Sequence, residues 1–433
     1  MLSNKNTKRK SSRNNKKTKR NNVKSKNRKY RKNTKSKTLI GGAGEPVLQQ
    51  TDPPRYIYTY VATLDSNGGK GQNFNKPVSI TISHDNRIYV CDKNNNRVQI
   101  FNGDTPNYTY IGTLGKSNKK IFSFMDDTIY PSGVAVSDDN RIYVADDTQN
   151  VVIIFNGKTL KRIKILKYLN MVPLSVAVSS TDNRLYVLDG KQCSIYVFNN
   201  KSYEFLFIYG YRCNKHDNFR NSFYNPVGIT VSPSDNLIYV ADTGNHQIKV
   251  FDSTTSSTTL TYIKTITPSL HAPITNNLRF YFPNSVAVST DNFIYIADTT
   301  NHRVQVFNDN IYINTLGIRN SSGSSNTQFN NPVAVAVSQD GKQIYVVDRD
   351  NNRVQVFDKT ELPPDYPLPD YPLPEYKSRI LMNGYTHNKT MNSNISRETN
   401  LPSPNYVALE SENAAARQDR RSRTYANITE LPI

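Results

Sequence analysis

One carboxylate recurs along the chain, as in the segments DTGNHQIKVF from Asp242 and DTTNHRVQVF from Asp298. Such an aspartate could act as an acid, as a base or as a metal ligand. His246 lies four residues after Asp242, and His302 lies four residues after Asp298. A zinc site needs three or four such ligands brought together. The equivalent positions of the other copies hold Asn96, Asn150, Cys193 and Asn352. The pattern therefore predicts neither a metal site nor a cofactor.

The aspartate itself occurs six times, at Asp92, Asp146, Asp189, Asp242, Asp298 and Asp348. At the end of a strand, a carboxylate can accept hydrogen bonds from the backbone of the following turn. It can also pair with an arginine, and Arg97, Arg303 and Arg353 follow three of the six. Six equivalent carboxylates have no evident use in catalysis, so we interpret them as structural and predict no catalytic residue.

Each aspartate belongs to a repeated unit of roughly 27 residues. The units begin at Pro77, Pro131, Pro173, Pro226, Pro283 and Pro332. In the fifth unit an alternating segment is followed by Asp291-Asn292, then by FIYIAD, a polar turn and a strand ending in Phe307. Asp-Asn between alternating apolar segments is typical of a hairpin, because both residues tolerate the positive φ of a tight turn. Three antiparallel strands per unit are expected.

A fourth apolar segment follows each of the first five units, starting at Tyr108, Leu160, Tyr203, Leu260 and Tyr312. Six four-stranded antiparallel sheets in succession predict an all-β fold, the six-bladed β-propeller. The sixth unit has no such segment after Phe357, whereas YIYTYVATL, residues 56–64, stands alone before the first unit. We expect this N-terminal strand to complete the last blade and close the ring.

The units resemble the NHL repeat, in which a proline and a short Val-Ala-Val strand precede Asp-Gly or Asp-Asn. A Tyr-Val-Ala-Asp strand end, Asn-His-Arg and a Val-Gln-Val-Phe strand complete the pattern. The resemblance covers residues 56–357, and the six units match the blade number typical of the family. It implies a broad range of functions, because NHL propellers include RNA-binding domains, protein-interaction platforms, extracellular sensor domains and a metal-dependent amidating lyase.

A propeller enzyme usually places its chemistry in the central channel, which the innermost strands line. If their Val and Ile side chains pack between the sheets, the channel-facing positions are Ser79, Thr81, Gly133, Ala135, Ser175, Ala177, Gly228, Thr230, Ser285, Ala287, Ala334 and Ala336. Such side chains are poor metal ligands and do not act as acids or bases near neutral pH. We therefore expect a non-enzymatic interaction module; the alternative, a metal-dependent lyase or a lactonase-like enzyme, lacks channel ligands.

Composition separates the ends from the propeller, which we place at residues 55–359. The first 40 residues contain 17 of the Lys and Arg residues and no Asp or Glu, and supply most of the net charge of +20. This predicts a basic disordered arm over residues 1–50. Residues 360–376 read as a Pro-rich spacer, and residues 377–433 as a mostly disordered tail.

No apolar segment of signal-peptide or transmembrane length is evident, so we expect a soluble, intracellular protein, in the cytoplasm, nucleus or virion, with a monomeric propeller. Its cysteines are Cys91, Cys193 and Cys213, an odd number without CxxC spacing. This pattern favours reduced thiols over a disulfide. The many Asn and Lys residues and the basic end also resemble proteins of large DNA viruses with AT-rich genomes.

The long connections between an outer strand and the next inner strand share one side of a propeller, here called the loop face. Two of them combine cations and aromatic residues, a mixture suited to phosphates and unstacked bases. The candidate partner-binding residues are Lys116, Lys119, Lys120, Phe122, Arg212, Lys215, Phe219 and Arg220. Two hypotheses remain open. In one, the arm binds RNA or DNA, with or without the loop face; in the other, the propeller is a protein scaffold whose arm serves localisation or packaging.

Overall fold

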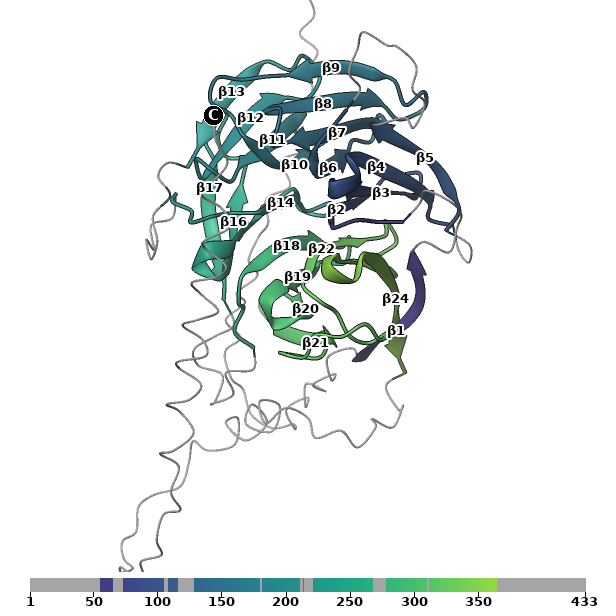
Figure 1. Ribbon diagram of the computed structural model, residues 1–433. Helices are drawn as coiled ribbons and strands as arrows, with labels where there is room; N and C mark the ends of the chain where they lie inside the picture. The colour runs from purple at the N-terminus through teal and green to yellow at the C-terminus, as the bar shows by residue number, and fades with distance from the viewer. Residues whose placement is uncertain are drawn as a thin grey trace, which may run out of the picture. The chain divides into compact units, whose positions relative to one another are not determined.

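The computed structural model describes residues 55–64, 73–104, 108–115, 128–179, 181–210, 213, 221–267, 278–309 and 311–363. These residues form a six-bladed β-propeller of four-stranded antiparallel sheets, as the repeat pattern predicts (Figure 1). The basic arm, the C-terminal tail and residues 364–376 of the spacer lie outside the described residues. No helix in the described part is long and apolar enough to span a membrane.

Blades 1 to 6 follow the order of the six units. Their innermost strands are β2 (Pro77–Ile82), β6 (Pro131–Val136), β10 (Pro173–Ser179), β14 (Gly228–Val231), β18 (Pro283–Val288) and β22 (Pro332–Val337). The second strands are β3 (Arg87–Asp92), β7 (Arg141–Asp146), β11 (Arg184–Asp189), β15 (Ile238–Asp242), β19 (Phe293–Asp298) and β23 (Gln343–Asp348).

The third strands are β4 (Arg97–Asn102), β8 (Val151–Asn156), β12 (Ser194–Asn199), β16 (Gln247–Asp252), β20 (Arg303–Asn308) and β24 (Arg353–Leu362). The outer strands are β5 (Tyr110–Gly115), β9 (Arg162–Leu166), β13 (Phe205–Tyr209), β17 (Thr261–Ile266), β21 (Ile311–Gly317) and β1 (Arg55–Leu64). In blades 1, 4, 5 and 6 a short 3-10 helix follows the second strand: η2 (Lys93–Asn95), η3 (Thr243–Asn245), η4 (Thr299–Asn301) and η5 (Arg349–Asn351).

The hairpin between the first two strands of each blade depends on a residue that tolerates a left-handed backbone. Asn292 has φ 65° and Gly341 has φ 73° at equivalent positions. The preceding aspartate completes the turn, since the Ser289 hydroxyl donates a hydrogen bond to Asp291 at 2.5 Å. The Asp-Asn and Asp-Gly pairs of the sequence thus form these hairpins, as expected.

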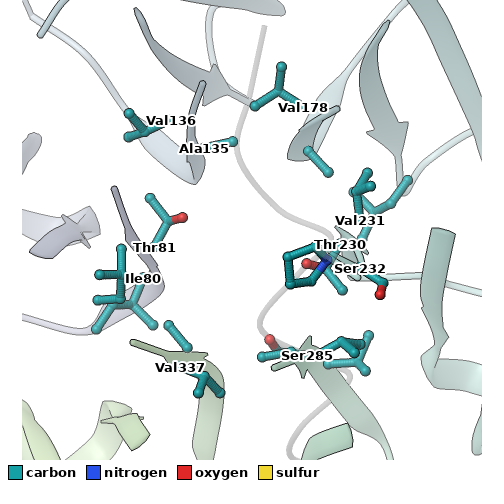
Figure 2. Close-up of a pocket in the computed structure, with 18 of the residues that line it drawn as sticks. Ile80, Thr81, Ala135, Val136, Val178, Thr230, Val231, Ser232, Ser285 and Val337 are labelled. Carbon is teal, nitrogen blue, oxygen red and sulfur yellow. The ribbon is translucent and has the colours of Figure 1, made fainter. Parts of the chain in front are cut away.

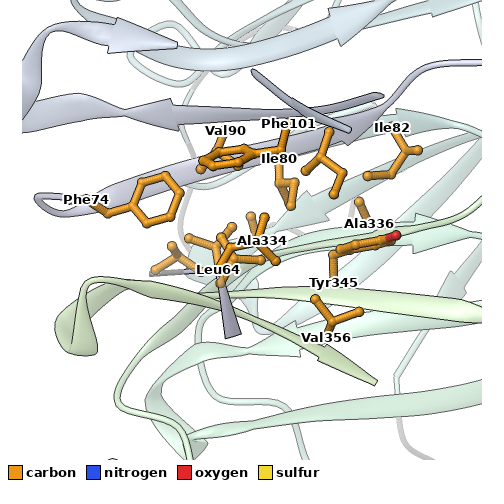
Figure 3. Packing of buried hydrophobic residues seen from close by; sticks show 14 residues of the cluster. Leu64, Phe74, Ile80, Ile82, Val90, Phe101, Ala334, Ala336, Tyr345 and Val356 are labelled. Carbon is orange, nitrogen blue, oxygen red and sulfur yellow. The ribbon is translucent and has the colours of Figure 1, made fainter. Parts of the chain in front are cut away.

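The N-terminal strand β1 closes the ring, as predicted, by pairing antiparallel with β24. Figure 3 shows the packing at this junction, where Leu64 of β1 and Val356 of β24 belong to the same hydrophobic cluster as Phe74 and Ile80 of blade 1. One boundary differs from the expectation: β24 continues to Leu362, beyond residue 359. Residues 360–362 are held in the sheet because they pair with residues 55–57 of β1.

Hydrophobic clusters fill the spaces between neighbouring blades. The aromatic position of the second strand contributes side chains that are completely buried: Tyr89, Tyr143, Tyr186, Tyr295 and Tyr345. Both faces of each sheet are covered by a neighbour, so the blades present their edges and turns to solvent. The two ends of the ring and its channel are therefore the places to look for a site.

Candidate functional site

The six repeated aspartates each end the second strand of a blade, and all are fully buried. The Asp298 carboxylate accepts a hydrogen bond from the backbone N–H of Tyr281 at 2.6 Å. Its other oxygen accepts hydrogen bonds at 2.8 Å from the side chains of Asn301, Arg303 and Gln305. One carboxylate thus joins the incoming segment, the turn and the third strand.

The arginine partners expected from the sequence are present in three blades. The Arg Nε to Asp Oδ2 distance is 2.8 Å for Arg303, 2.8 Å for Arg97 and 2.7 Å for Arg353. Blade 4 uses another arrangement that the sequence reading missed. There Lys249, only 2% exposed, lies 3.4 Å from Asp242 and donates a hydrogen bond to the carbonyl of Ser222 at 2.5 Å. A lysine inside the buried strand QIKVF was the signal that could have revealed it.

Blades 2 and 3 have no cation in these positions, and their aspartates bind the turn backbone. Asp146 accepts hydrogen bonds from the N–H groups of Thr148 at 3.1 Å and Gln149 at 2.7 Å, and Asp189 accepts two from the equivalent turn. Burial raises the pKa of Asp146, and these hydrogen bonds oppose the shift. In all six blades the carboxylate is engaged in holding a turn.

The two histidines connect blades. His246 and His302 have left-handed backbones, with φ 57° and 56°, like Asn352 with φ 55°. Nδ1 of His246 accepts a hydrogen bond from the N–H of Phe282 at 3.0 Å, and Nδ1 of His302 accepts one from Asn331 at 3.1 Å. In each case the donor immediately precedes the first proline of the next blade. We call this contact the inter-blade latch.

The same latch closes the ring, since the N–H of Lys76 donates a hydrogen bond to Oδ1 of Asn352 at 2.9 Å. Lys76 also pairs with Asp350 across this junction at 3.0 Å. Within the described residues, no group of three or more His, Cys, Asp or Glu side chains could hold a metal ion.

The channel encloses a cavity of about 430 Å³ lined by the inner strands and the hairpin turns (Figure 2). The expected Thr81, Thr230 and Ser285 line it, but so do Val136 and Val178. All the predicted channel-facing positions except Gly133 line the cavity, but the expectation that the Val and Ile side chains are kept out of it is wrong.

The error lies in the geometry of the innermost strand. Val176 packs towards blade 2 and Ala177 packs towards blade 4, so both faces of β10 are covered. The edge of the strand borders the channel, and neighbouring residues reach the cavity from either side. The exposed turn residues His84 and Asp138, which were not predicted from the sequence, contribute titratable side chains to the lining.

The loop face is defined by contacts between the turn after each second strand and the segment entering the blade. Backbone hydrogen bonds run from Gly244 to Tyr224 at 2.8 Å and from Thr300 to Tyr281 at 3.2 Å. The candidate residues Lys116, Lys119, Lys120, Phe122, Arg212, Lys215, Phe219 and Arg220 lie outside the described residues. The described residues that flank these two segments lie at the loop face. Next to the first segment, the Gln149 side chain donates a hydrogen bond to the Thr128 carbonyl at 2.8 Å.

The second of these segments is anchored by a disulfide between Cys193 and Cys213, with a Cα–Cα distance of 5.3 Å. The expectation of three reduced thiols is therefore wrong, although Cys91 is free and buried. Cys193 has φ 54° and occupies the latch position of blade 3. The propeller brings this turn against the following segment, a proximity that the 20-residue separation alone did not indicate.

Comparisons with known proteins agree with this architecture. The model of the NHL repeat matches residues 74–101, 128–150, 223–251, 280–307 and 329–357, which belong to blades 1, 2, 4, 5 and 6. NHL repeat-containing protein 2 from Bos taurus is 35% identical over 83 residues, and its Homo sapiens counterpart is 33% identical over 82. Each alignment covers 19% of this chain but 11% of the relative.

A solved structure shares the fold alone. It is a structural genomics protein of unknown function from Bacteroides thetaiotaomicron, with a TM-score of 0.51 and 14% identity, covering 71% of this chain and 77% of that one. Five of the six blades match the NHL repeat, so the chain is a six-bladed propeller that contains NHL repeats.

Proposed function

We propose that the propeller is a non-catalytic binding scaffold whose partner contacts the loop face, and that this partner is a single-stranded nucleic acid. The observation that supports the proposal is that a rigid framework of sheets holds the described ends of the connecting segments on one side of the ring. Loops held by a rigid scaffold are where binding residues concentrate. The opposite side consists of short hairpin turns such as residues 289–293.

The chemistry of two segments supports a nucleic acid partner. Residues 116–127 and 211–220 combine lysines and arginines with phenylalanines. The described residues Thr128 and Tyr224, which follow the two segments, lie at the loop face. Cations neutralise phosphates, and aromatic rings stack on unpaired bases. The basic arm adds an attraction to phosphates that does not depend on base sequence. A protein partner is the alternative outcome of the test below.

The repeated residues support a scaffold rather than an enzyme. Each buried aspartate holds a turn, and the histidines accept backbone hydrogen bonds through Nδ1. The channel wall consists largely of Ser, Thr, Ala, Val and Ile side chains, which offer little for acid–base catalysis.

Binding of single-stranded RNA to the full-length chain, measured by fluorescence anisotropy across a range of salt concentrations, tests the proposal. A variant with Glu in place of Lys119, Lys120, Arg212 and Lys215, here called the loop-face variant, removes four cations from the two segments. The matched control places Glu at four exposed lysines of the opposite side: Lys158, Lys161, Lys201 and Lys342. Both variants undergo the same change in net charge.

We expect the loop-face variant to bind more weakly and with a shallower salt dependence than the control. Equal loss in both variants would show that only net charge and the arm matter. Absence of binding by the wild type at low salt would contradict a nucleic acid partner and favour a protein.

A further inference from the structure

Three aromatic rings meet on the loop face where blade 4 adjoins blade 5. The rings of His246 and Tyr281 stack with centroids 5.1 Å apart and planes at 13°. Phe282 lies edge-on, with its centroid 4.5 Å from that of His246 and 5.0 Å from that of Tyr281. Tyr281 is 42% exposed and Phe282 is 39% exposed. We call these three residues the aromatic cluster.

The inter-blade latch does not require this cluster. Its backbone donor is Phe282 here, but Asn331 at the junction of blades 5 and 6 and Lys76 at the closing junction. The chain's own repeats therefore show that the latch forms with polar residues in the donor position. The exposed aromatic side chains of blade 5 need another explanation.

The backbone conformation of Phe282 is a second reason to expect a function for its side chain. Phe282 has φ 53°, a left-handed conformation that is strained for a bulky side chain but tolerated by asparagine. The corresponding Asn225 and Asn331 have φ 45° and 54°. A strained residue held by its surroundings is a reason to look for a function there. At this position the phenyl ring adds exposed apolar surface, and asparagine would satisfy the backbone better.

The surroundings fit a nucleic acid better than an apolar partner. Arg279, two residues before Tyr281, is exposed and can reach a phosphate, while its carbonyl is fixed by hydrogen bonds from Asn301 and Arg303. On the other side, the turn that carries His246 packs closely on Tyr224, since a Cβ added at Gly244 would lie 2.3 Å from that ring.

Tyr224 follows the segment 211–220, which contains Arg212 and Lys215. Aromatic rings therefore extend from the beginning of blade 4 to the beginning of blade 5, and the segment that precedes Tyr224 in the sequence is rich in cations. Flat rings beside cations are the combination that holds unpaired bases and their phosphates.

We propose that Tyr281 and Phe282, supported by His246, form a stacking platform for unpaired bases of single-stranded nucleic acid. This proposal rests on the proposed function. It assigns the base contacts to Tyr281 and Phe282, which lie outside the two cationic segments. A base stacks on the exposed ring of Tyr281, and Arg279 contacts the adjoining phosphate.

The absence of tryptophan from the chain allows a direct test. Tyr281→Trp gives the full-length protein one fluorescent reporter in the platform, and Tyr110→Trp gives one on the outer strand β5, where Tyr110 is 38% exposed. Each protein is titrated with a short oligouridylate and with an abasic strand of the same length and charge. Anisotropy of labelled strands reports binding independently of the tryptophan signal.

We expect the oligouridylate to quench the fluorescence of the Tyr281→Trp protein and the abasic strand to leave it nearly unchanged. Neither strand should alter the fluorescence of the Tyr110→Trp protein. Tyr281→Ala with Phe282→Asn, which keeps the latch donor, should lower the affinity for oligouridylate about tenfold without changing the salt dependence. Tyr281→Phe should bind as the wild type does.

The outcomes separate the two proposals. If the wild type binds the oligouridylate but the tryptophan of the Tyr281→Trp protein is not quenched, the platform is wrong and the loop-face function stands. The same conclusion follows if the double variant binds as well as the wild type. If neither strand binds at low salt, the proposed function fails together with the platform.

Discussion

At the scale of single residues, the buried pair of Arg303 and Asp298 has the clearest energetic role. Their side chains are 3% and 0% exposed. Removing one partner of a buried pair leaves an uncompensated charge, so Arg303→Ala should lower the free energy of unfolding by about 3 kcal/mol. Chemical denaturation of the two proteins measures the difference.

The control is Lys264→Ala, which breaks a pair with the exposed Asp309 and should change stability by less than about 1 kcal/mol. A loss of nucleic acid binding by Arg303→Ala at unchanged stability would instead give this arginine a functional role.

The latch at His302 should make the stability of the propeller depend on pH. Burial lowers the pKa of His302, although Asp350 and Asp348 oppose the shift. Since Nδ1 accepts a hydrogen bond from Asn331, the neutral ring is the bound form. A lowered folded-state pKa gives stability that is present above the unfolded pKa of about 6.5 and is lost as pH falls below it.

His302→Asn provides the test because Asn352 forms the same latch without titrating. We expect the melting temperature of the wild type to fall more steeply than that of His302→Asn as the pH is lowered from neutrality through the range in which the histidine takes up a proton. Parallel curves for the two proteins would show that the latch does not couple to protonation.

The sequence predicted some of these residue roles and missed others. The pairs of Arg97, Arg303 and Arg353 followed from their constant distance after the aspartate. Lys249 was missed because it lies two residues further along the third strand than the arginines do, at a position where blades 1, 5 and 6 have a glutamine. The sequence wrongly excluded the Val and Ile residues from the channel, because alternation tells only which side of a strand a residue takes, and here both sides of the innermost strand are covered.

At the scale of elements, the disulfide joins the turn after β11 to the segment that follows β13. Linking residues 20 apart restricts the unfolded chain, which stabilises the fold by about 3 kcal/mol in the loop-entropy model. Cys213→Ser should lower the unfolding free energy by an amount of this order. Denaturation with and without a thiol reductant measures it.

Reductant should destabilise the wild type and leave Cys213→Ser unchanged. Cys91→Ala is the control, because its thiol is free and the variant should keep the response to reductant. A wild type indifferent to reductant would contradict a stabilising role for the disulfide.

The strands were predictable because each blade repeats one alternation and one turn chemistry. The extension of β24 was not, because it depends on residues 55–57, far away in the sequence, rather than on the local pattern. The turns of blades 2 and 3 also differ from the 3-10 helices of the other blades. In blades 2 and 3 the aspartate accepts hydrogen bonds from the backbone N–H groups of the turn, because Val151 and Ser194 stand where the other blades have Arg or Gln.

At the scale of the whole molecule, the ring depends on β1. Removing residues 1–50 leaves this strand intact and should not alter the melting temperature. Removing residues 1–66 deletes the partner of β24 and uncovers the surface of blade 5 on which Tyr56 packs against Phe293. We expect this shorter chain to unfold at lower temperature or to aggregate.

Thermal unfolding followed by circular dichroism, with light scattering, distinguishes the two truncations. Equal stability would contradict closure by β1. The number of blades and the closing strand were predictable from the sequence, because six units and one unmatched strand leave few other arrangements. The two cationic segments could be identified by composition, but their contacts depend on how the ring places their ends.

Closure by the first strand also has a consequence for the nascent chain. Translation produces β1 before any blade, and produces its partner β24 after all the others. Blades 1 to 5 can form from contiguous segments as they leave the ribosome, whereas the sixth must wait for synthesis to reach Leu362. Until then β1 has an unpaired edge and the exposed side chains of Ile57 and Val61. An incomplete chain therefore presents a strand that can pair with β24 of another copy whose own β1 has not yet paired, which makes strand exchange between copies the characteristic assembly error of this ring.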